Sequence, residues 1–283
     1  MAIFTNQATI SYNNTIRNSN VTTGQILTTV SATKTAVMDD YTAGDDVTYV
    51  ISILNSGTTA LTDVTVTDDL GGYDFEGETV YPLRYVTGSI QYYVNGVLQT
   101  PPSVDDGQTL VITGLNIPAG GNIMLIYETE VTQFAPLDAD GTITNTATIT
   151  GACIGETVTA EETINTQDEP NLTITKSVFP ATVTGCGQLT YTFIIQNTGN
   201  TAADADANVI ITDDFDPALR NLLVTFNGEP LAEGTGYTYN EETGEFATIA
   251  GQITVPAATF TQDENGAWVV NPGVSVLTVT GTL

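Results

Sequence analysis

The sequence predicts an all-β protein built from two tandem β-sandwich domains, the second of which lacks its closing strands. Three observations support this prediction: apolar and polar residues alternate along most segments, turn residues recur at short intervals, and the chain repeats itself. Alternation is typical of half-buried strands, because successive side chains point to opposite faces. Many short strands separated by turns are typical of sandwiches.

An internal repeat of about 140 residues organises the chain. Two matching pairs of segments define it: SATKTAV (31–37) with TITKSVF (173–179), and VTYVISILNSG (47–57) with LTYTFIIQNTG (189–199). Asn-Gly pairs at 95–96 and 227–228 predict tight hairpin turns at equivalent places. We therefore expect three parts: an N-terminal arm (1–30), a first β-sandwich (31–168) and a second, incomplete β-sandwich (169–283).

The closing strands of the repeat do not follow both copies of it: one set follows the first copy, and the other set precedes it at the N-terminus. The first copy closes with ITNTATI at 143–149, and a further strand pattern follows it up to residue 166. In the second copy, the segment 277–283 aligns with 123–129, which is the strand before the closing one. The missing motif occurs at the other end of the chain, where FTNQATI at 4–10 matches ITNTATI position by position.

A sandwich without closing strands exposes an apolar cleft and unpaired strand edges. The N-terminal strand of a second molecule would cover both by strand addition. The inward-facing residues of this donor strand would be Phe4, Asn6, Ala8, Ile10 and Tyr12. Such a contact is head-to-tail and generates a filament, so we expect the partner of this protein to be itself. Two alternatives remain open: the arm folds back onto its own second domain, or it packs as an extra strand on the first.

Three types of polar residue fall on the apolar side of predicted strands. In the first copy they are Lys34, Asp68 and Asn145; in the second copy and the arm they are Lys176, Asp213 and Asn6. Burial of an unpaired Lys or Asp costs several kcal/mol, so each set predicts a cluster of interacting side chains. The first cluster would form within one chain, and the second between two chains.

Two explanations of these clusters remain open. One is a buried Lys–Asp ion pair capped by the Asn amide. The other is an isopeptide bond, in which a desolvated and therefore neutral Lys attacks the Asn side chain while a protonated Asp polarises the Asn carbonyl and shuttles protons. An isopeptide bond between Lys176 and Asn6 would join neighbouring copies covalently.

The chain resembles the conserved-repeat domain that occurs in tandem in large bacterial surface proteins. The matching motifs are a Lys-bearing first strand, a Thr-Tyr strand, Asn-x-Gly, Val-Thr-Val-Thr-Asp, Pro-Ala-Gly and a closing strand, at Lys34, 48–49, 55–57, 64–68, 118–120 and 143–149. The resemblance covers nearly the whole chain and implies an immunoglobulin-like fold with a structural or adhesive surface role. The Lys–Asp–Asn sets are similar to those of the self-crosslinked domains of Gram-positive pilins and collagen adhesins.

Composition excludes several classes of function. The chain has 33 Asp and Glu against 5 Lys and Arg, a net charge of −28, so no basic patch can neutralise nucleic-acid phosphates or an anionic membrane surface. The absence of His excludes imidazole metal sites as well as Ser-His-Asp and Cys-His catalysis. The acidic residues are scattered through turns rather than paired, so we expect neither an enzyme nor a cofactor.

Two weaker signals have competing interpretations. Cys153 and Cys186 are candidates for a disulfide within or between chains, and unpaired thiols are an equal alternative. Asp138 and Asp140 precede Gly141 as in part of a calcium-binding loop, but the full pattern of such a loop is absent. A solvated turn is therefore favoured over a Ca²⁺ site.

The sequence favours a structural role. No secretory signal is visible at the N-terminus, and no apolar stretch is long enough for a membrane helix. We expect a location outside the cell or on the cell or spore surface, reached by a route that the sequence does not show. The leading hypothesis is a filament subunit that polymerises head to tail. The alternative is a monomeric surface adhesin or ligand-binding module.

Overall fold

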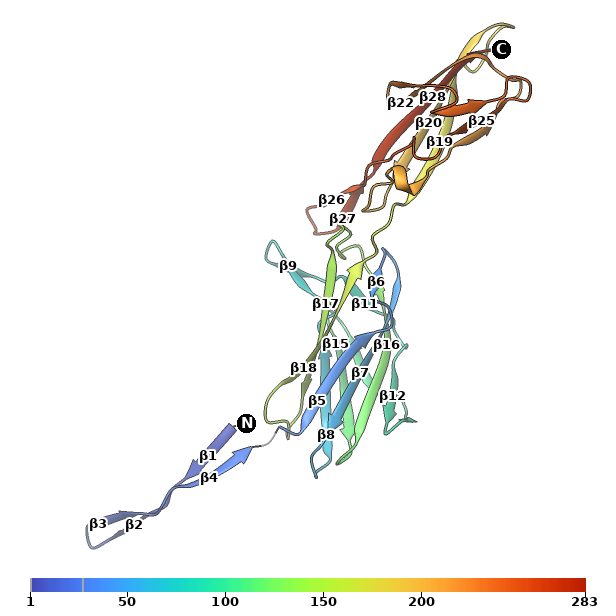
Figure 1. Ribbon diagram of the computed structural model, residues 1–283. Coiled ribbons are helices and arrows are strands. Elements are labelled where there is room, and N and C mark those ends of the chain that lie inside the picture. Colours follow the sequence, from blue (N-terminus) through green and yellow to red (C-terminus); the bar gives the residue numbers. More distant parts are fainter. Residues whose placement is uncertain (1, 27) are drawn as a thin grey trace. The chain divides into compact units, whose positions relative to one another are not determined.

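The computed structural model describes residues 2–26 and 28–283, and in them it confirms the all-β prediction (Figure 1). The sole helical element of this part of the chain is one 3-10 turn at Ala205–Ala207. The chain divides into two compact units, the first comprising Met1–Ala135 and Thr142–Asn165 and the second Pro136–Gly141 and Thr166–Leu283. The described residues include no helix long and apolar enough to span a membrane.

Unit 1 contains two six-stranded sheets that pack face to face. The first has the order β13-β12-β16-β7-β5, with β11 also paired to β16: β5 (Val30–Ala36), β7 (Asp46–Asn55), β11 (Leu83–Tyr85), β12 (Gln91–Val94), β13 (Val97–Leu98) and β16 (Asn122–Val131). The second has the order β14-β15-β8-β17-β18-β6: β6 (Asp40–Tyr41), β8 (Leu61–Asp68), β14 (Ser103–Asp106), β15 (Leu110–Ile117), β17 (Thr142–Thr150) and β18 (Val158–Thr166). A separate hairpin is formed by β9 (Tyr73–Phe75) and β10 (Glu78–Val80).

The core of unit 1 lies between these two sheets, because alternate side chains of each strand point inward. On β7 the inward residues Val47, Tyr49, Ile51 and Ile53 are all fully buried. They belong to one apolar cluster with buried residues of β8, β15 and β17 from the opposite sheet. Side chains of both sheets therefore share a single core.

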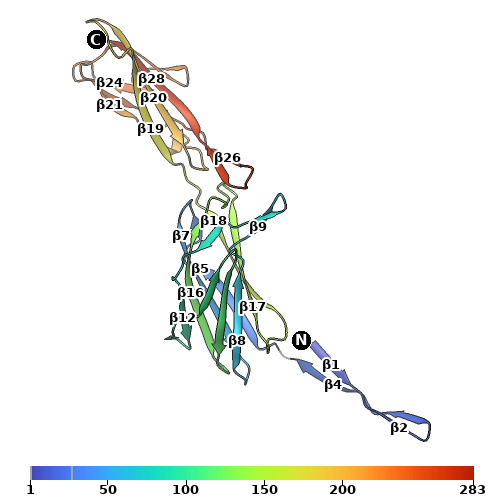
Figure 2. The ribbon, with the colours of Figure 1, turned by 180° about the vertical axis from the view of Figure 1, so that it is seen from behind.

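Unit 2 has a five-stranded and a three-stranded sheet (Figure 2). The larger has the order β19-β20-β28-β22-β23: β19 (Leu172–Phe179), β20 (Gln188–Asn197), β22 (Arg220–Phe226), β23 (Glu229–Leu231) and β28 (Gly273–Thr282). The smaller has the order β21-β25-β24: β21 (Thr212–Asp214), β24 (Tyr237–Tyr239) and β25 (Glu245–Thr248). A separate hairpin is formed by β26 (Thr259–Gln262) and β27 (Trp268–Asn271).

The two units share the strand order of one sheet but differ in the other. β19 pairs with β20 as β5 pairs with β7, with Lys176 opposite Phe193 where Lys34 is opposite Ile51. In unit 1, β8 is flanked by β15 and β17, and the sheet continues to β18 and β6. In unit 2, β21 pairs with β25 alone, so the described residues of this unit contain no counterpart of β17 and β18.

The register of the last strand differs from the alignment predicted from the sequence by two residues. Leu277 pairs with Phe193, and Leu125 pairs with Ile51, so Leu277 is the counterpart of Leu125. Apolar alternation does not reveal this error, because a slip of two residues leaves every side chain on the same face of the sheet. Only the pairing with β20 fixes the register.

Motifs that recur in the sequence have equivalent structures in both units. Asn95-Gly96 joins β12 to β13 and Asn227-Gly228 joins β22 to β23, each with positive φ at both positions, as tight hairpins favour. The Asn-x-Gly motif places Asn55 and Asn197 inside the two units. Each of these side chains donates hydrogen bonds to backbone oxygens and accepts a hydrogen bond from the backbone N–H two residues further along the chain.

Residues 2–26 form a separate hairpin, which we call the arm. Its strands are β1 (Ala2–Asn6) paired with β4 (Thr22–Ile26), and β2 (Thr9–Tyr12) paired with β3 (Thr15–Asn18). Asn13 and Asn14 both have positive φ and form the turn. Within the part of the chain that the structure describes, these four strands pair only with one another.

Each unit has a proximal end, where its first strand (β5 or β19) begins, and a distal end, where that strand finishes. At the distal end of unit 1, the N–H of Asn165 near the finish of β18 donates to the Asp39 oxygen just after β5. The β17–β18 turn lies at the proximal end, where it lines a small cavity with residues 28–30. At the distal end of unit 2, the N–H of Leu283 donates to Gly187 in the loop 180–187.

Candidate cross-linking and assembly site

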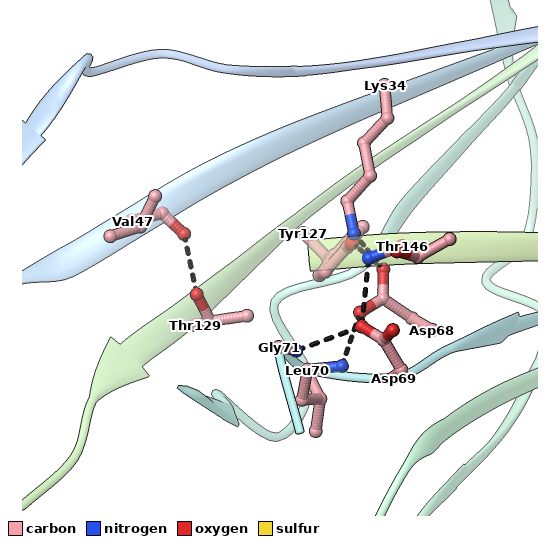
Figure 3. A network of polar contacts seen from close by, with 9 residues as sticks. All are labelled: Lys34, Val47, Asp68, Asp69, Leu70, Gly71, Tyr127, Thr129 and Thr146. Atoms are coloured by element: carbon pink, nitrogen blue, oxygen red, sulfur yellow. Dashed lines mark hydrogen bonds and ion pairs between the residues drawn. The ribbon is translucent and has the colours of Figure 1, made fainter. Parts of the chain in front are cut away.

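Lys34 and Asp68 form a buried ion pair in the core of unit 1 (Figure 3). The Lys34 Nζ atom lies 2.6 Å from Asp68 Oδ2, and neither side chain has exposed surface. The same ammonium group is 4.8 Å from the centre of the Tyr49 ring, which favours a cation. Because two charges are removed from water here, loss of either partner would leave the other uncompensated.

Two tyrosines complete the surroundings of this ion pair. The Tyr127 hydroxyl donates a hydrogen bond to Asp68 Oδ2, and the N–H of Leu70 donates to Oδ1 at 3.0 Å. Burial, reinforced by the Asp68 charge, raises the pKa of Tyr127 well above its usual value, and burial likewise raises the pKa of Tyr49. Burial lowers the pKa of Lys34, although Asp68 opposes this change. The phenols are therefore held protonated, while the neutral form of Lys34 becomes easier to reach than in water.

Asn145 is fully buried in the same core without a regular hydrogen bond. It lies on β17 two residues before Ala147, which pairs with Asp68. Neither its side-chain oxygen nor its side-chain nitrogen has a hydrogen-bonding partner among the described residues. An unsatisfied buried amide costs about 1–3 kcal/mol, so this position calls for an explanation.

The cluster combines three groups with complementary chemistry in a dry core. A neutral Lys34 amine is a nucleophile, the Asn145 amide carbon is an electrophile, and the Asp68 carboxylate that bonds the amine can accept its proton. Tyr127 was not among the residues predicted from the sequence. Its only sequence signal is an inward-facing Tyr in the alternation of 122–131, because its contact with Asp68 crosses between the two sheets.

Lys176 and Asp213 form the equivalent ion pair in unit 2, but this pair is only partly covered, with the Lys176 side chain exposed. Their side chains keep 39% and 15% of their surface exposed, whereas the pair in unit 1 is fully covered. The Lys176 ammonium lies 4.5 Å from the centre of the Tyr191 ring. In unit 1, Tyr127 pairs with Tyr49; at the equivalent position in unit 2, Val279 pairs with Tyr191. Unit 2 therefore has no second hydroxyl at this place.

An uncovered apolar surface surrounds the pair in unit 2. Ile174 and Val178, which flank Lys176 on β19, are 53% and 38% exposed. On the opposite sheet, β21 has a neighbouring strand on one side only. We call this surface the open face; it consists of Ile174, Lys176 and Val178 with the free edge of β21. Its exposure follows from the lack of counterparts to β17 and β18 in the described residues of unit 2.

The predicted donor residues are all exposed on the arm. Phe4, Ile10 and Tyr12 are 57%, 63% and 53% exposed, and Asn6 and Ala8 are exposed as well. The donor strand predicted over residues 4–12 is not continuous, because it is divided between β1 and β2. At the division, the Ala8 N–H donates a hydrogen bond to the Ser19 hydroxyl, and the Ala8 carbonyl oxygen accepts one from the Ser19 N–H. These bonds replace the regular strand pairing.

The remaining candidate residues do not gather into a site. Cys153 and Cys186 are free and exposed. Asp138 and Asp140 lie in the turn before Gly141, which is closed by the backbone oxygen of Asp138 accepting the Gly141 N–H. In the ranges 2–26 and 28–283, no group of three or more His, Cys, Asp or Glu side chains is arranged to hold a metal ion.

The raised tyrosine pKa values predict that the free energy of unfolding falls above pH 10. In that range the unfolded tyrosines lose their protons while Tyr49 and Tyr127 keep theirs, so each contributes a loss of up to about 1.4 kcal/mol per pH unit. The lowered pKa of Lys34 acts in the opposite sense, but only up to the unfolded pKa of about 10.4. Tyr127→Phe is expected to reduce the slope measured by denaturant unfolding above this value. Tyr93→Phe, outside the cluster, is the control, and equal slopes for both variants would contradict the prediction.

No family model and no curated protein matches the chain. Solved structures similar to it include two pilins and an adhesin domain. The pilus backbone protein RrgB of Streptococcus pneumoniae is 12% identical with a TM-score of 0.36, covering 86% of this chain and 55% of its own. The major pilin subunit BcpA of Bacillus cereus is 11% identical with a TM-score of 0.35, covering 87% and 65%. A collagen-binding domain of a Staphylococcus aureus adhesin is 14% identical with a TM-score of 0.32, covering 50% and 99%. The chain thus spans little more than half the length of RrgB.

Proposed function

We propose that this protein is a structural subunit of an extracellular or cell- or spore-surface filament that polymerises head to tail. The arm of one copy occupies the open face of unit 2 in the next copy. The observation that carries this proposal is the contrast between the two ion pairs, one fully buried under β17 and β18 and the other exposed where such strands are absent. A docked arm would take the place of those strands.

The arm has the pairing and the side chains that this place requires. It is a hairpin like β17–β18, with Phe4 opposite Gly24 where unit 1 has Ile143 opposite Ile164. The Phe4 ring lies directly over Gly24, so the pair presents one large apolar group. Burial of each large apolar side chain contributes about 1.5–3 kcal/mol, so burial of the exposed row on the arm would favour docking.

Charge also favours docking of the arm. Residues 1–26 contain Arg17 and no acidic residue, whereas all 33 Asp and Glu lie in the rest of the chain. A segment without acidic residues does not add to the repulsion between acidic surfaces when it is brought against unit 2. The arm would therefore approach an acidic partner without bringing a negative charge to the contact.

The connection of the arm favours a second copy over the same chain as its partner. Ile26 is only four residues from Val30, which begins β5 at the proximal end of unit 1. The chain leaves unit 1 after Thr166, at the distal end, and nine-residue β18 accounts for about 27 Å between the two ends. The short connection thus ties the arm to the end of unit 1 opposite the one from which the chain continues to unit 2, and we take a second copy as the partner of the arm.

We further propose that isopeptide bonds lock both clusters. The Lys34 amine attacks the side-chain carbonyl carbon of Asn145, the new carbon–nitrogen bond replaces the bond to the amide nitrogen, and ammonia leaves with the proton that Asp68 carries from the amine. The unsatisfied Asn145 amide and the lowered Lys34 pKa both support this step. Between copies, Lys176, Asp213 and Asn6 of the docked arm would react in the same way.

Deletion of residues 2–26 tests the proposed polymerisation. Full-length protein is expected to form oligomers in size-exclusion chromatography with light scattering, and the deleted protein to remain monomeric. A synthetic hairpin of residues 2–26 should bind the deleted protein at one per chain, because the open face is vacant there. The same hairpin with Ile10→Lys is the control and should bind at least tenfold more weakly, since a charge would enter an apolar contact. Monomers in both full-length and deleted protein would instead favour a monomeric surface adhesin.

A further inference from the structure

Each unit of the chain has one cysteine, and neither has a role in the clusters described above. Cys153 lies in the β17–β18 turn, at the proximal end of unit 1, and Cys186 lies in the loop 180–187, at the distal end of unit 2. Both thiols are free and exposed. Their positions lead to an inference that rests on the proposed head-to-tail assembly.

Both cysteines lie at ends that face away from the connection between the units. The chain leaves unit 1 at its distal end and enters unit 2 at its proximal end. Gly44 is the counterpart of Cys186, since each lies two residues before its strand with positive φ, a conformation that suits Gly better than Cys. The repeat therefore carries a thiol only at ends that would meet another copy.

Docking of the arm would bring these two ends together. In the docked arm, β4 would take the place that β18 has in unit 1. Because β18 ends at the distal end of unit 1, β4 would end at the distal end of the neighbour's unit 2, beside the loop of Cys186. Ile26, the last residue of β4, lines the small cavity next to Cys153 in its own chain. From Ile26 to Val30 the chain spans at most about 14 Å, so the two thiol-bearing loops would lie on either side of a short joint.

We infer that Cys153 of one copy forms a disulfide with Cys186 of the preceding copy. The bond forms by thiol–disulfide exchange with a low-molecular-weight disulfide such as oxidised glutathione. The two protein thiols give up two protons and two electrons, and the oxidant is reduced to two thiols. A covalent link across the joint keeps the arm in the open face, because the arm cannot withdraw while the loops beside its exit are joined.

Isotope mixing distinguishes bonds between copies from bonds within one chain. Equal amounts of isotopically light and heavy full-length protein are polymerised in a glutathione buffer, alkylated and digested, and the linked peptides are identified by mass spectrometry. We expect Cys153–Cys186 peptides, of which about half join a light to a heavy partner, and roughly tenfold fewer in protein lacking residues 2–26, because the arm supplies the effective concentration. Linked peptides of one label only, or pairs of identical cysteines, would overturn the inference.

A cysteine-free variant separates this inference from the proposed function. Cys153→Ser with Cys186→Ser leaves the arm and the open face intact, so the variant is expected to polymerise in size-exclusion chromatography. Polymers of this variant, combined with no linked peptides from the parent protein, overturn the disulfide alone. Monomers of both the variant and the parent overturn the proposed function and the disulfide together.

Discussion

Boiling in SDS with a reductant is expected to leave a ladder of covalent oligomers of the parent protein and a single monomer band of the Asn6→Ala variant. Asn6 occurs in the arm at the position that Asn145 occupies in the closing strand of unit 1. Once docked, it would meet Lys176 and Asp213, which already form an ion pair at the open face. Without its amide there is no carbon for Lys176 to attack, so the arm would remain bound by reversible contacts only.

Asn145→Ala is the matched control for this experiment. It removes the amide from unit 1 and leaves the arm unchanged, so the ladder should persist. Intact-mass measurement then counts the bonds, because each one releases one ammonia molecule. A parent protein that runs as a monomer of the calculated mass would show that neither isopeptide bond forms, whereas polymers under native conditions would still support docking of the arm.

Asp68→Ala is expected to destabilise unit 1 by about 3–5 kcal/mol, the range found when one partner of a buried ion pair is removed. Lys34 would be left fully buried without a counter-charge, and the Tyr127 hydroxyl and the Leu70 N–H would lose their acceptor. The same substitution removes the proton acceptor for the proposed bond, so the ammonia should be retained. Denaturant unfolding followed by circular dichroism measures the loss, while fluorescence of the single Trp268 reports unit 2 separately.

Two comparisons test the physical reason for this effect. Asp213→Ala should cost clearly less than Asp68→Ala in protein lacking the arm, because the Lys176 side chain that it leaves without a partner is 39% exposed and can be hydrated. Lys34→Met combined with Asp68→Leu should recover much of the lost stability, since the core then contains no unpaired charge. Equal losses for Asp68→Ala and Asp213→Ala would contradict the assignment of the first pair as buried and the second as open.

Tyr127 and the last strand show what sequence reasoning missed. The sequence places Tyr127 on the inward face of its strand, but the hydrogen bond to Asp68 joins two sheets whose residues are distant in the chain. The alignment of Leu277 was wrong by two residues because alternation has a period of two, and only pairing with Phe193 fixes its register. Contacts between strands, rather than patterns along them, decided both points.

The sequence by itself determined the all-β class, the repeat and the inward side of Lys34, Asp68 and Asn145, because strand parity is a local property of the chain. The tertiary structure decided how far each cluster is covered. Lys34 is buried and Lys176 is exposed although their local sequences are similar, since burial depends on whether a second sheet has strands to place over the first. The same physical rule explains why the open face of unit 2 exists only in the context of the folded unit.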